Sequence, residues 1–318
     1  MKLEDIKRVG VIGAGLMGHG IAQVFAMAGY DVRLYDVDKT TLEKARDRIR
    51  DNLGVFVELG LFSADEVGPC LERVAVCRTI EELCGGCGFI VEAVVEDLQI
   101  KRSTFLKVEG LVRPDTILAT NTSAISITEI ASVLAEKGRF LGTHFWNPPH
   151  ILPCVEVIKG AETRDDVFET VYALLDKVGK APVRVLKDVP GFLGNRLQHA
   201  MWREAFALCD RGVASPEDID RVVKYGFGAR MFFLGPMETA DLAGLDLTRS
   251  IHRYLFPYLD NSTSPAAVLE RLIAAGALGV KTGRGFGEWP PERIEKVIKR
   301  RDRVLLRVLR DLGTGAGT

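Results

Sequence analysis

The first part of the chain alternates short, almost wholly apolar segments with longer segments whose apolar residues recur every three or four positions. A continuous apolar run bounded by turns predicts a buried β-strand, and the longer period predicts an amphipathic helix. The predicted strands read VGVIG, DVRLYD, RVAVC, FIVEAVV, TILATN, RFLGTHF, CVEVI and APVRVL. Because buried strands that alternate with helices form sheets covered on both faces, this part is predicted to be a doubly wound α/β domain with a mainly parallel sheet.

The pattern changes after residue 189. The segment GNRLQHAMWREAFALCDRG predicts a long helix, and the next helix opens with Ser215 as its N-cap and Pro216 at its first position. No strand is predicted beyond this point. We therefore expect an α/β domain over residues 1–189 and an all-α domain over residues 190–318. The last segment, ERIEKVIKRRDRVLLRVLRDL, predicts a basic amphipathic helix that is solvated or supports a dimer.

Length and composition exclude several classes of protein. With 318 residues, of which 47% are hydrophobic and 27% charged, the chain has the composition of a globular protein rather than a disordered or fibrous one. Its net charge of −1 gives no reason to expect nucleic acid or a membrane as a partner. The chain has no apolar run long enough for a membrane-spanning helix and no signal-peptide layout at its start, so we expect a cytoplasmic protein.

The six cysteines are scattered, which predicts free thiols in a reducing compartment rather than a disulfide framework. Cys84 and Cys87 form a Cys-x-x-Cys motif, but no second pair or nearby histidine completes a metal site. A glycine-rich turn before a strand explains this motif better than a redox or metal role, and we expect no bound metal.

The segment VGVIGAGLMGHGIA carries a glycine motif between a predicted strand and a predicted helix. In this Gly-x-Gly-x-x-Gly motif the first glycine permits a tight turn, the second lets the backbone approach a pyrophosphate, and the third lets the helix pack on the strand. The helix N-terminus then favours the phosphates. The candidate cofactor-binding residues here are Gly13, Gly15, Leu16, Met17 and Gly18.

An acid at the end of the second predicted strand narrows the choice of cofactor. Asp36 is placed to accept hydrogen bonds from the adenosine ribose, and it would repel a 2′-phosphate. This favours NAD over NADP. FAD is the alternative for the glycine motif, although the second part of the chain has no flavin-like segment, and a turn cap is the alternative for Asp36.

Two further predicted strands, RFLGTHF and CVEVI, each carry one unusual residue: His144 near the end of the first and Glu156 inside the second. A buried carboxylate is unfavourable without a partner, and if the two strands are adjacent Glu156 reaches the ring of His144. Such a pair fixes the imidazole tautomer and leaves the other nitrogen basic, as a general base requires. A structural His–Glu pair, or an acid that faces water from an edge strand, explains these residues equally well.

These segments together resemble the L-3-hydroxyacyl-CoA dehydrogenase family over nearly the whole chain. The matching segments are VIGAGLMGHGIA, IVEAVVEDLQIK, ATNTSAISIT, HFWNPP with VEVI, DVPGFLGNRL, GPMETADLAGLD and KTGRGF. The resemblance implies a Rossmann-like domain followed by a helical, dimer-forming domain. It also implies NAD-linked oxidation of a 3-hydroxyl group to a ketone on a small-molecule substrate.

The resemblance implies roles for particular residues. His144 would be the general base, and Glu156 its orienting partner. Ser123 would hydrogen-bond the reacting oxygen of the substrate, and Asn195 would reach into the cleft from the second domain to hold that oxygen or the carbonyl. The positions that match the family's NAD site are Glu96, Lys101, Asn147 and Lys281. Each has a plainer explanation as a helix cap, a turn residue or a solvated lysine.

Three features depart from the members of the family that use CoA thioesters. Those members tend to carry lysines in the helix and turn after the second strand, where cations meet the phosphates of CoA, but here residues 51–72 contain no basic residue. The turn NPPHILP differs from the family's commoner form, and the segment before GPMETADLAG is longer. These features resemble the branch of lambda-crystallin (L-gulonate dehydrogenase), carnitine dehydrogenase and a pyridine-carboxylate dehydrogenase. Arg230, in the longer segment, is either a ligand for a substrate carboxylate or a surface arginine.

Three hypotheses follow for the function. The first is an NAD-dependent dehydrogenase of a small hydroxy acid without CoA, which the missing lysines favour slightly. The second is a 3-hydroxyacyl-CoA dehydrogenase whose CoA contacts come from elsewhere, such as Arg46, Arg48 or Arg50. The third is a non-catalytic, crystallin-like NAD-binding protein, against which the intact set of Ser123, His144, Glu156 and Asn195 argues.

Overall fold

The computed structural model describes residues 1–313, and the chain divides into two compact units. The first unit comprises Met1–Asn195 together with the C-terminal residues from Lys299 onward, and the second comprises Arg196–Ile298. The division therefore lies a few residues past the predicted boundary at residue 189. The prediction of one helical domain over residues 190–318 did not include the return of the C-terminal segment to the first unit.

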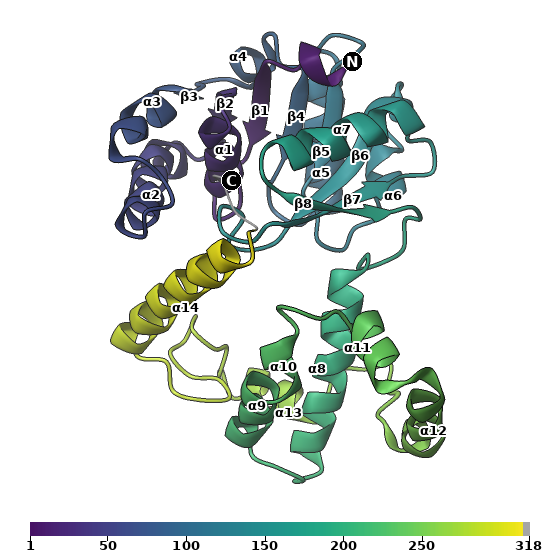
Figure 1. The fold of residues 1–318 in the computed structure, drawn as a ribbon. Helices are drawn as coiled ribbons and strands as arrows, with labels where there is room; N and C mark the ends of the chain where they lie inside the picture. The colour runs from purple at the N-terminus through teal and green to yellow at the C-terminus, as the bar shows by residue number, and fades with distance from the viewer. Residues whose placement is uncertain (314–318) are drawn as a thin grey trace. The chain divides into compact units, whose positions relative to one another are not determined.

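The first unit is built on one sheet of eight strands in the order β3-β2-β1-β4-β5-β6-β7-β8, with helices on both sides of it (Figure 1). Neighbouring strands are parallel except β6 and β7, which are antiparallel. The strands are β1 (Arg8–Ile12), β2 (Asp31–Tyr35), β3 (Val74–Val76), β4 (Phe89–Glu92), β5 (Ile117–Thr120), β6 (Phe140–Phe145), β7 (Cys154–Lys159) and β8 (Ala181–Val185). Each corresponds to one of the eight predicted strands, and the predicted doubly wound fold is confirmed.

Alternation along the strands places apolar side chains on both faces of the sheet. In β1, Val9 and Val11 join a core with Phe25 on one face, whereas Ile12 joins a second core with Phe105 on the other. The helices that supply the first core are α1 (Gly18–Met27), α2 (Lys39–Glu58), α3 (Val67–Glu72) and α7 (Asp165–Lys177); those that supply the second are α4 (Ile80–Cys84), α5 (Leu98–Glu109) and α6 (Ile127–Ala131). Short 3-10 turns lie at Leu3–Asp5, Ala64–Glu66 and Lys137–Arg139.

The second unit is helical. Its helices are α8 (Gly194–Asp210, which begins in the first unit), α9 (Pro216–Tyr225), α10 (Phe227–Arg230), α11 (Pro236–Ala243), α12 (Leu245–Leu255) and α13 (Ala267–Ala274), with a 3-10 turn at Phe256–Tyr258. Helix α9 begins as predicted, with the Ser215 side chain accepting a hydrogen bond from the Asp218 N–H. Of residues 196–298, all of which the structure describes, only Ala277 is buried. This unit therefore has almost no core of its own within one chain.

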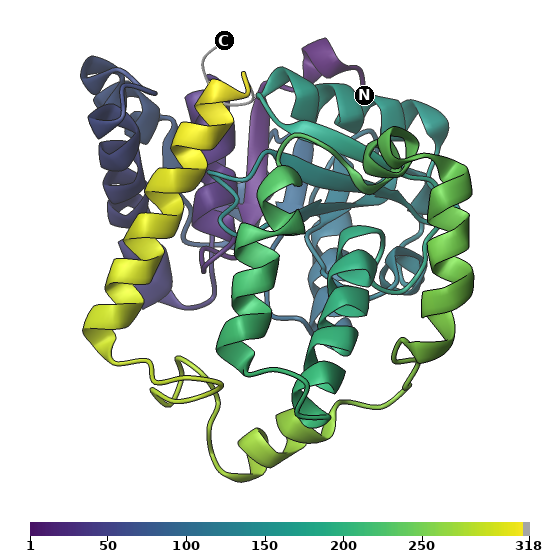
Figure 2. The ribbon, with the colours of Figure 1, turned by 60° about the horizontal axis from the view of Figure 1, so that its bottom comes forward.

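The last helix, α14 (Pro291–Asp311), ends against the first unit (Figure 2). Its residues Leu306 and Leu309 form a small buried cluster with Phe56 and Ile151. The sequence predicted a solvated or dimer-supporting helix here. Most of α14 is exposed, and only Leu306 and Leu309 are buried, because its apolar stripe meets apolar residues at the end of α2 and in the loop before β7; the dimer-supporting role stays a prediction. Between residues 1 and 313, no helix is long and apolar enough to span a bilayer.

Candidate active site

The glycine motif forms the turn between β1 and α1, and each glycine is required for a different reason. Gly13 has φ +97°, and a Cβ there would lie 2.5 Å from the Ala93 carbonyl oxygen. A Cβ on Gly18 would lie 1.7 Å from the Gly13 carbonyl oxygen, so only glycine lets the helix start so close to the strand. A Cβ on Gly15 would have no atom within 4 Å, which leaves its backbone open to a ligand. This geometry fits a dinucleotide pyrophosphate.

Asp36 lies just after β2 and beside the glycine turn. One of its carboxylate oxygens accepts a hydrogen bond of 2.7 Å from the Ala14 N–H, and the other accepts one of 2.8 Å from the Asp38 N–H. The carboxylate is thus fixed next to the turn, and its remaining lone pairs suit ribose hydroxyls. Leu16 is exposed and Met17 half-buried at the start of α1.

His144 and Glu156 face each other across β6 and β7. The antiparallel register pairs these two residues directly, and His144 Nδ1 lies 2.7 Å from Glu156 Oε2. Both side chains are enclosed, with exposed fractions of 5% for His144 and 2% for Glu156. A carboxylate at Nδ1 keeps a proton on that nitrogen, so Nε2 is left as the basic atom.

Glu156 is held in its ionised form by more than the histidine. Its other oxygen accepts hydrogen bonds from the backbone N–H groups of Leu193 at 2.8 Å and Gly194 at 3.0 Å. Burial acts to raise the pKa of Glu156, but the hydrogen bonds from His144, Gly194 and Leu193 outweigh it and hold the pKa below its usual value. The chain before α8 therefore supports the pair as well as joining the units.

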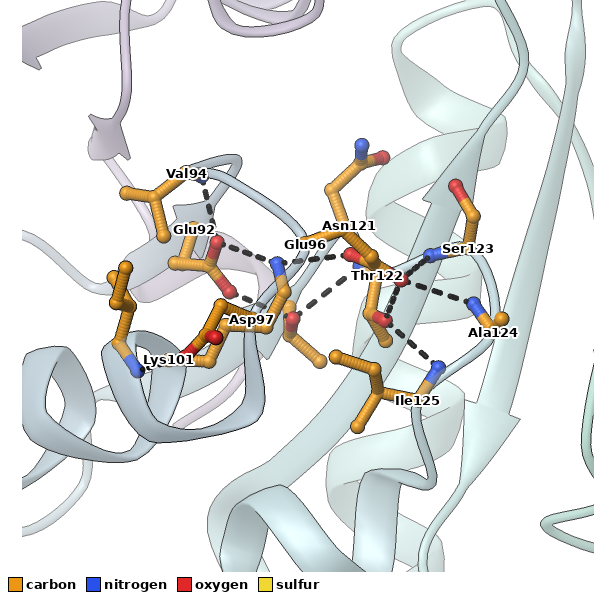
Figure 3. Close-up of polar contacts among 12 residues, drawn as sticks. Glu92, Val94, Glu96, Asp97, Lys101, Asn121, Thr122, Ser123, Ala124 and Ile125 are labelled. Atoms are coloured by element: carbon orange, nitrogen blue, oxygen red, sulfur yellow. Dashed lines mark hydrogen bonds and ion pairs between the residues drawn. The ribbon is translucent and has the colours of Figure 1, made fainter. Parts of the chain in front are cut away.

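Ser123 and Asn195 are in contact with each other, and Asn195 directly follows Gly194, whose N–H donates to Glu156. Asn195, the last residue of the first unit, donates a hydrogen bond of 2.7 Å from Nδ2 to the Ser123 carbonyl oxygen. The hydroxyl of Ser123 points away from Glu96, and within residues 1–313 it makes no hydrogen bond (Figure 3). One amide hydrogen of Asn195 and this hydroxyl are therefore available to a substrate oxygen.

Glu96 organises the loop that carries Ser123. Its Oε1 accepts hydrogen bonds from the Thr122 hydroxyl at 2.6 Å, the Ser123 N–H at 2.9 Å and the Ala124 N–H at 3.1 Å (Figure 3). Lys101 Nζ lies 3.4 Å from its other oxygen. Two residues that the sequence assigned to the cofactor site are thus joined to one assigned to the substrate.

Glu92 completes this network, and it was not among the predicted site residues. Its exposed fraction is 0%, and its carboxylate forms an ion pair of 2.8 Å with Lys101, whose exposed fraction is 1%. The Thr120 hydroxyl at 2.7 Å and the Val94 N–H at 2.6 Å also donate to it. Burial raises the pKa of Glu92, and the Lys101 ammonium opposes that rise. The signal was available in the sequence, because Glu92 is a lone acid in the apolar segment FIVEAVV, just as Glu156 is in CVEVI.

For the remaining predicted site residues, no hydrogen bond or ion pair within residues 1–313 indicates a role. Asn147 is exposed in the loop after β6. Arg230 is the last residue of α10, and Lys281 lies between α13 and α14, both in the second unit. Their assignments stay predictions. Cys84 and Cys87 are buried free thiols, and burial raises their pKa values to about 11 and about 12.

Comparison with known families gives matches over almost the whole chain. Residues 8–189 match the profile of the 3-hydroxyacyl-CoA dehydrogenase NAD-binding domain. Residues 191–289 match the profile of the 3-hydroxyacyl-CoA dehydrogenase C-terminal domain. The second profile ends before α14 begins.

Individual relatives fall into two groups. The 5-formyl-3-hydroxy-2-methylpyridine 4-carboxylate 5-dehydrogenase of Mesorhizobium japonicum is 36% identical over 308 residues, which cover 96% of this chain and 98% of that protein. A probable 3-hydroxybutyryl-CoA dehydrogenase of Bacillus subtilis is 40% identical over 286 residues, which cover 90% of this chain and 98% of that protein.

A solved structure of each kind is also similar. The crystal structure of a 5-formyl-3-hydroxy-2-methylpyridine 4-carboxylic acid 5-dehydrogenase, an NAD+-dependent dismutase, superposes with a TM-score of 0.91 at 36% identity, covering 98% of this chain and 99% of that one. The (S)-3-hydroxybutyryl-CoA dehydrogenase of Ralstonia eutropha superposes with a TM-score of 0.75 at 34% identity, covering 90% of this chain and 99% of that one.

Proposed function

Because the chain belongs to the 3-hydroxyacyl-CoA dehydrogenase family, we propose that it oxidises the hydroxyl group of a small hydroxy acid that carries no CoA. The protein is an NAD-dependent oxidoreductase that acts on CH–OH groups. The observation that carries the proposed chemistry is the enclosed His144–Glu156 pair, with a hydrogen bond of 2.7 Å.

In the proposed mechanism His144 removes the hydroxyl proton through Nε2. Glu156, already ionised, stabilises the imidazolium that forms and keeps the ring in the required tautomer. The Ser123 hydroxyl and the free amide hydrogen of Asn195 hold the substrate oxygen while its charge changes. Bound NAD would accept the hydride from the substrate carbon that carries this hydroxyl group. For the cofactor we propose contacts with the glycine turn, Asp36, Glu96, Lys101, Asn147 and Lys281.

The end of α2 supports a substrate without CoA. Residues 51–72 contain no lysine or arginine to meet the phosphates of CoA. In the same segment Glu58 forms an ion pair of 2.6 Å with Arg303 of α14, and Phe56 is buried against Leu306 and Leu309. This end of α2 therefore offers no cation of its own to a nucleotide phosphate.

The two relatives match different shares of this chain. The Bacillus subtilis relative leaves about a tenth of this chain unmatched, since its alignment covers 90% of it, whereas the pyridine-carboxylate dehydrogenase matches 96%. Helix α14, which covers the end of α2, lies beyond the family's C-terminal domain profile.

We propose Arg230 as the residue that binds the substrate carboxylate, since its guanidinium presents two parallel donors.

Oxidation of a 3-hydroxyacyl-CoA is the second candidate function, and the 40% identity to the Bacillus subtilis relative favours it. A non-catalytic role is the third, and the assembled network around Ser123, His144 and Glu156 argues against it.

We further propose that the protein is a cytoplasmic homodimer joined through its second unit. Large apolar side chains stand exposed on that unit, including Tyr225 at 81%, Met237 at 78% and Leu242 at 75%. Such a surface is unfavourable in water unless a second copy covers it. All six cysteines are free thiols, which is consistent with a reducing compartment. Sedimentation across a range of protein concentrations tests the dimer, and a monomer at all of them would contradict it.

The first experiment is to follow NADH formation with NAD and two kinds of substrate in parallel. One is L-3-hydroxybutyryl-CoA, and the other is a panel of free acids that includes gulonate, carnitine and 5-formyl-3-hydroxy-2-methylpyridine 4-carboxylate. We expect turnover of a free acid only. Turnover of the thioester alone would overturn the CoA-free proposal. Silence on both, with NAD still bound, would favour the non-catalytic hypothesis.

A further inference from the structure

The first unit contains a cavity of about 740 Å³ that the proposed function does not use. Its walls come from α1, the end of α2, the loop before β7, the turn between α7 and β8, and the end of α14. Among the described residues that line it, none belongs to the glycine turn at 13–18 or to the His144–Glu156 pair. Its volume is within the range of small-molecule sites, which is about 300–1,000 Å³.

Lys180 lines this cavity and has no acidic partner within residues 1–313. Its exposed fraction is 9%, and its ammonium donates to the carbonyl oxygens of Pro149 at 2.6 Å and Leu152 at 3.1 Å. Within residues 1–313 it forms no ion pair. A buried lysine without a carboxylate is unusual, and an ammonium has a third donor that these two carbonyls do not use. Burial lowers the pKa of Lys180 to about 7.

His150 adds a second unsatisfied group to the same wall. Its Nδ1 is buried and has no hydrogen-bond partner among the described residues. Burial lowers its pKa to about 3, and the charges of His19, Lys180 and Arg301 act in the same direction. Lys180 and His150 thus form a basic part of the wall, and neither makes an ion pair within residues 1–313.

The rest of the cavity limits what such an anion can be. Phe56, Ile151, Leu306 and Leu309 form an apolar wall. Glu66 and Asp176 also line the cavity and would repel a ligand with several negative charges. A single carboxylate meets both conditions, because it offers acceptor oxygens for the Lys180 ammonium and carries only one charge.

We propose that this cavity binds a small monocarboxylate with an apolar tail, its carboxylate on the Lys180 ammonium and its tail on the wall formed by Phe56, Ile151, Leu306 and Leu309. This site lies in the first unit and is distinct from the proposed catalytic residues. The proposal does not depend on which substrate the enzyme oxidises.

Calorimetric titration of the full-length protein, saturated with NAD, tests the site with sodium hexanoate as the probe. We expect one saturable site per chain. Hexan-1-ol, which keeps the tail and lacks the charge, should bind at least about tenfold more weakly, as should inorganic phosphate. Equal binding of hexanoate and hexan-1-ol, or stronger binding of phosphate, would overturn the proposal.

The Lys180→Met variant removes the charge and keeps the length of the side chain. Hexanoate affinity should fall about tenfold or more, whereas the control Lys177→Met, an exposed lysine at the same cavity, should leave it nearly unchanged. Equal affinity in Lys180→Met and the unaltered protein would exclude Lys180 as the anion partner.

A second measurement uses no variant, because replacing Lys180 also removes its hydrogen bonds to two loop carbonyls. The unaltered protein should take up a proton when hexanoate binds at mildly alkaline pH, because a carboxylate beside Lys180 restores its charge. Titration in two buffers of different ionisation enthalpy measures this uptake. Binding without proton uptake would place hexanoate elsewhere.

Discussion

Glu92 and Glu156 are two glutamates inside strands of one sheet, both almost fully enclosed, and they differ in their partner. Glu92 faces the ammonium of Lys101 at 2.8 Å, and Glu156 faces the imidazole of His144 at 2.7 Å. The first pair joins two groups that Thr120, Val94 and Glu96 also hold in place, so its contacts are all within the fold. The second pair contains an imidazole, the side chain best suited to proton transfer, and we propose it for the reaction. The same signal in the sequence thus marks one position with a structural ion pair and one with a proposed chemical role.

Replacing the histidine should have the largest effect on catalysis. In His144→Ala, kcat should fall by about 10³- to 10⁴-fold, because proton removal loses its acceptor. The dissociation constant for NAD, measured by fluorescence quenching, should stay close to that of the unaltered protein. The exposed His199→Ala is the matched control. Near-normal turnover in His144→Ala would remove the base assignment.

Replacing the other buried acid should act on folding rather than on the chemical step. Glu92→Gln leaves the buried Lys101 ammonium with only Glu96, whose nearest oxygen is 3.4 Å away, and loss of one member of a buried ion pair costs about 3–5 kcal/mol. Urea unfolding measures this loss. The double variant Glu92→Gln/Lys101→Met should recover part of it, because it removes the buried ammonium that has lost its shorter ion pair. A stability loss in Glu92→Gln that the double variant does not reduce would mean that the ion pair is not its cause.

Glu156→Gln should reduce the catalytic rate more than it reduces stability. We expect kcat to fall about 10²-fold with a smaller change in KM, since both the tautomer and the imidazolium depend on the carboxylate. The unfolding free energy should change less than in Glu92→Gln, because a glutamine at this position can still accept the hydrogen bonds from the Leu193 and Gly194 N–H groups. The exposed Glu162→Gln serves as control. If Glu156→Gln raised KM alone, the carboxylate would not act through the base.

The smallest expected effect concerns the dependence of stability on pH. The folded pKa of Glu156 is held below its ordinary value of 4.5, so its stabilising contribution is complete above that pH and is lost as the pH falls through the folded pKa. Unfolding free energies measured from neutral to acidic pH should therefore fall less steeply in Glu156→Gln than in the unaltered protein. Parallel curves would show that the carboxylate is not held ionised by the fold.

Much of the fold could be read from the sequence because local pattern and tertiary environment agree. All eight strands were predicted, and the signal was strongest for the central strands β1, β4, β5 and β6, which are buried on both faces of a covered sheet. The glycine turn was predicted because its conformation excludes side chains at Gly13 and Gly18. The packing of the C-terminal half of α14 on the first unit was not predicted. An amphipathic stripe indicates that a helix packs against another element, but it does not indicate which one.

The sequence by itself determined the glycine turn, Asp36 beside it, and the two carboxylates in apolar strands. These depend on steric exclusion and on the cost of burying charge, which act residue by residue. Tertiary structure alone decided the partners. The antiparallel register of β6 and β7 brings Glu156 to His144, and a side chain from α5 brings Lys101 to Glu92. Contacts between segments far apart in the sequence depend on how strands and helices pack, and no local sequence pattern specifies which segments become neighbours.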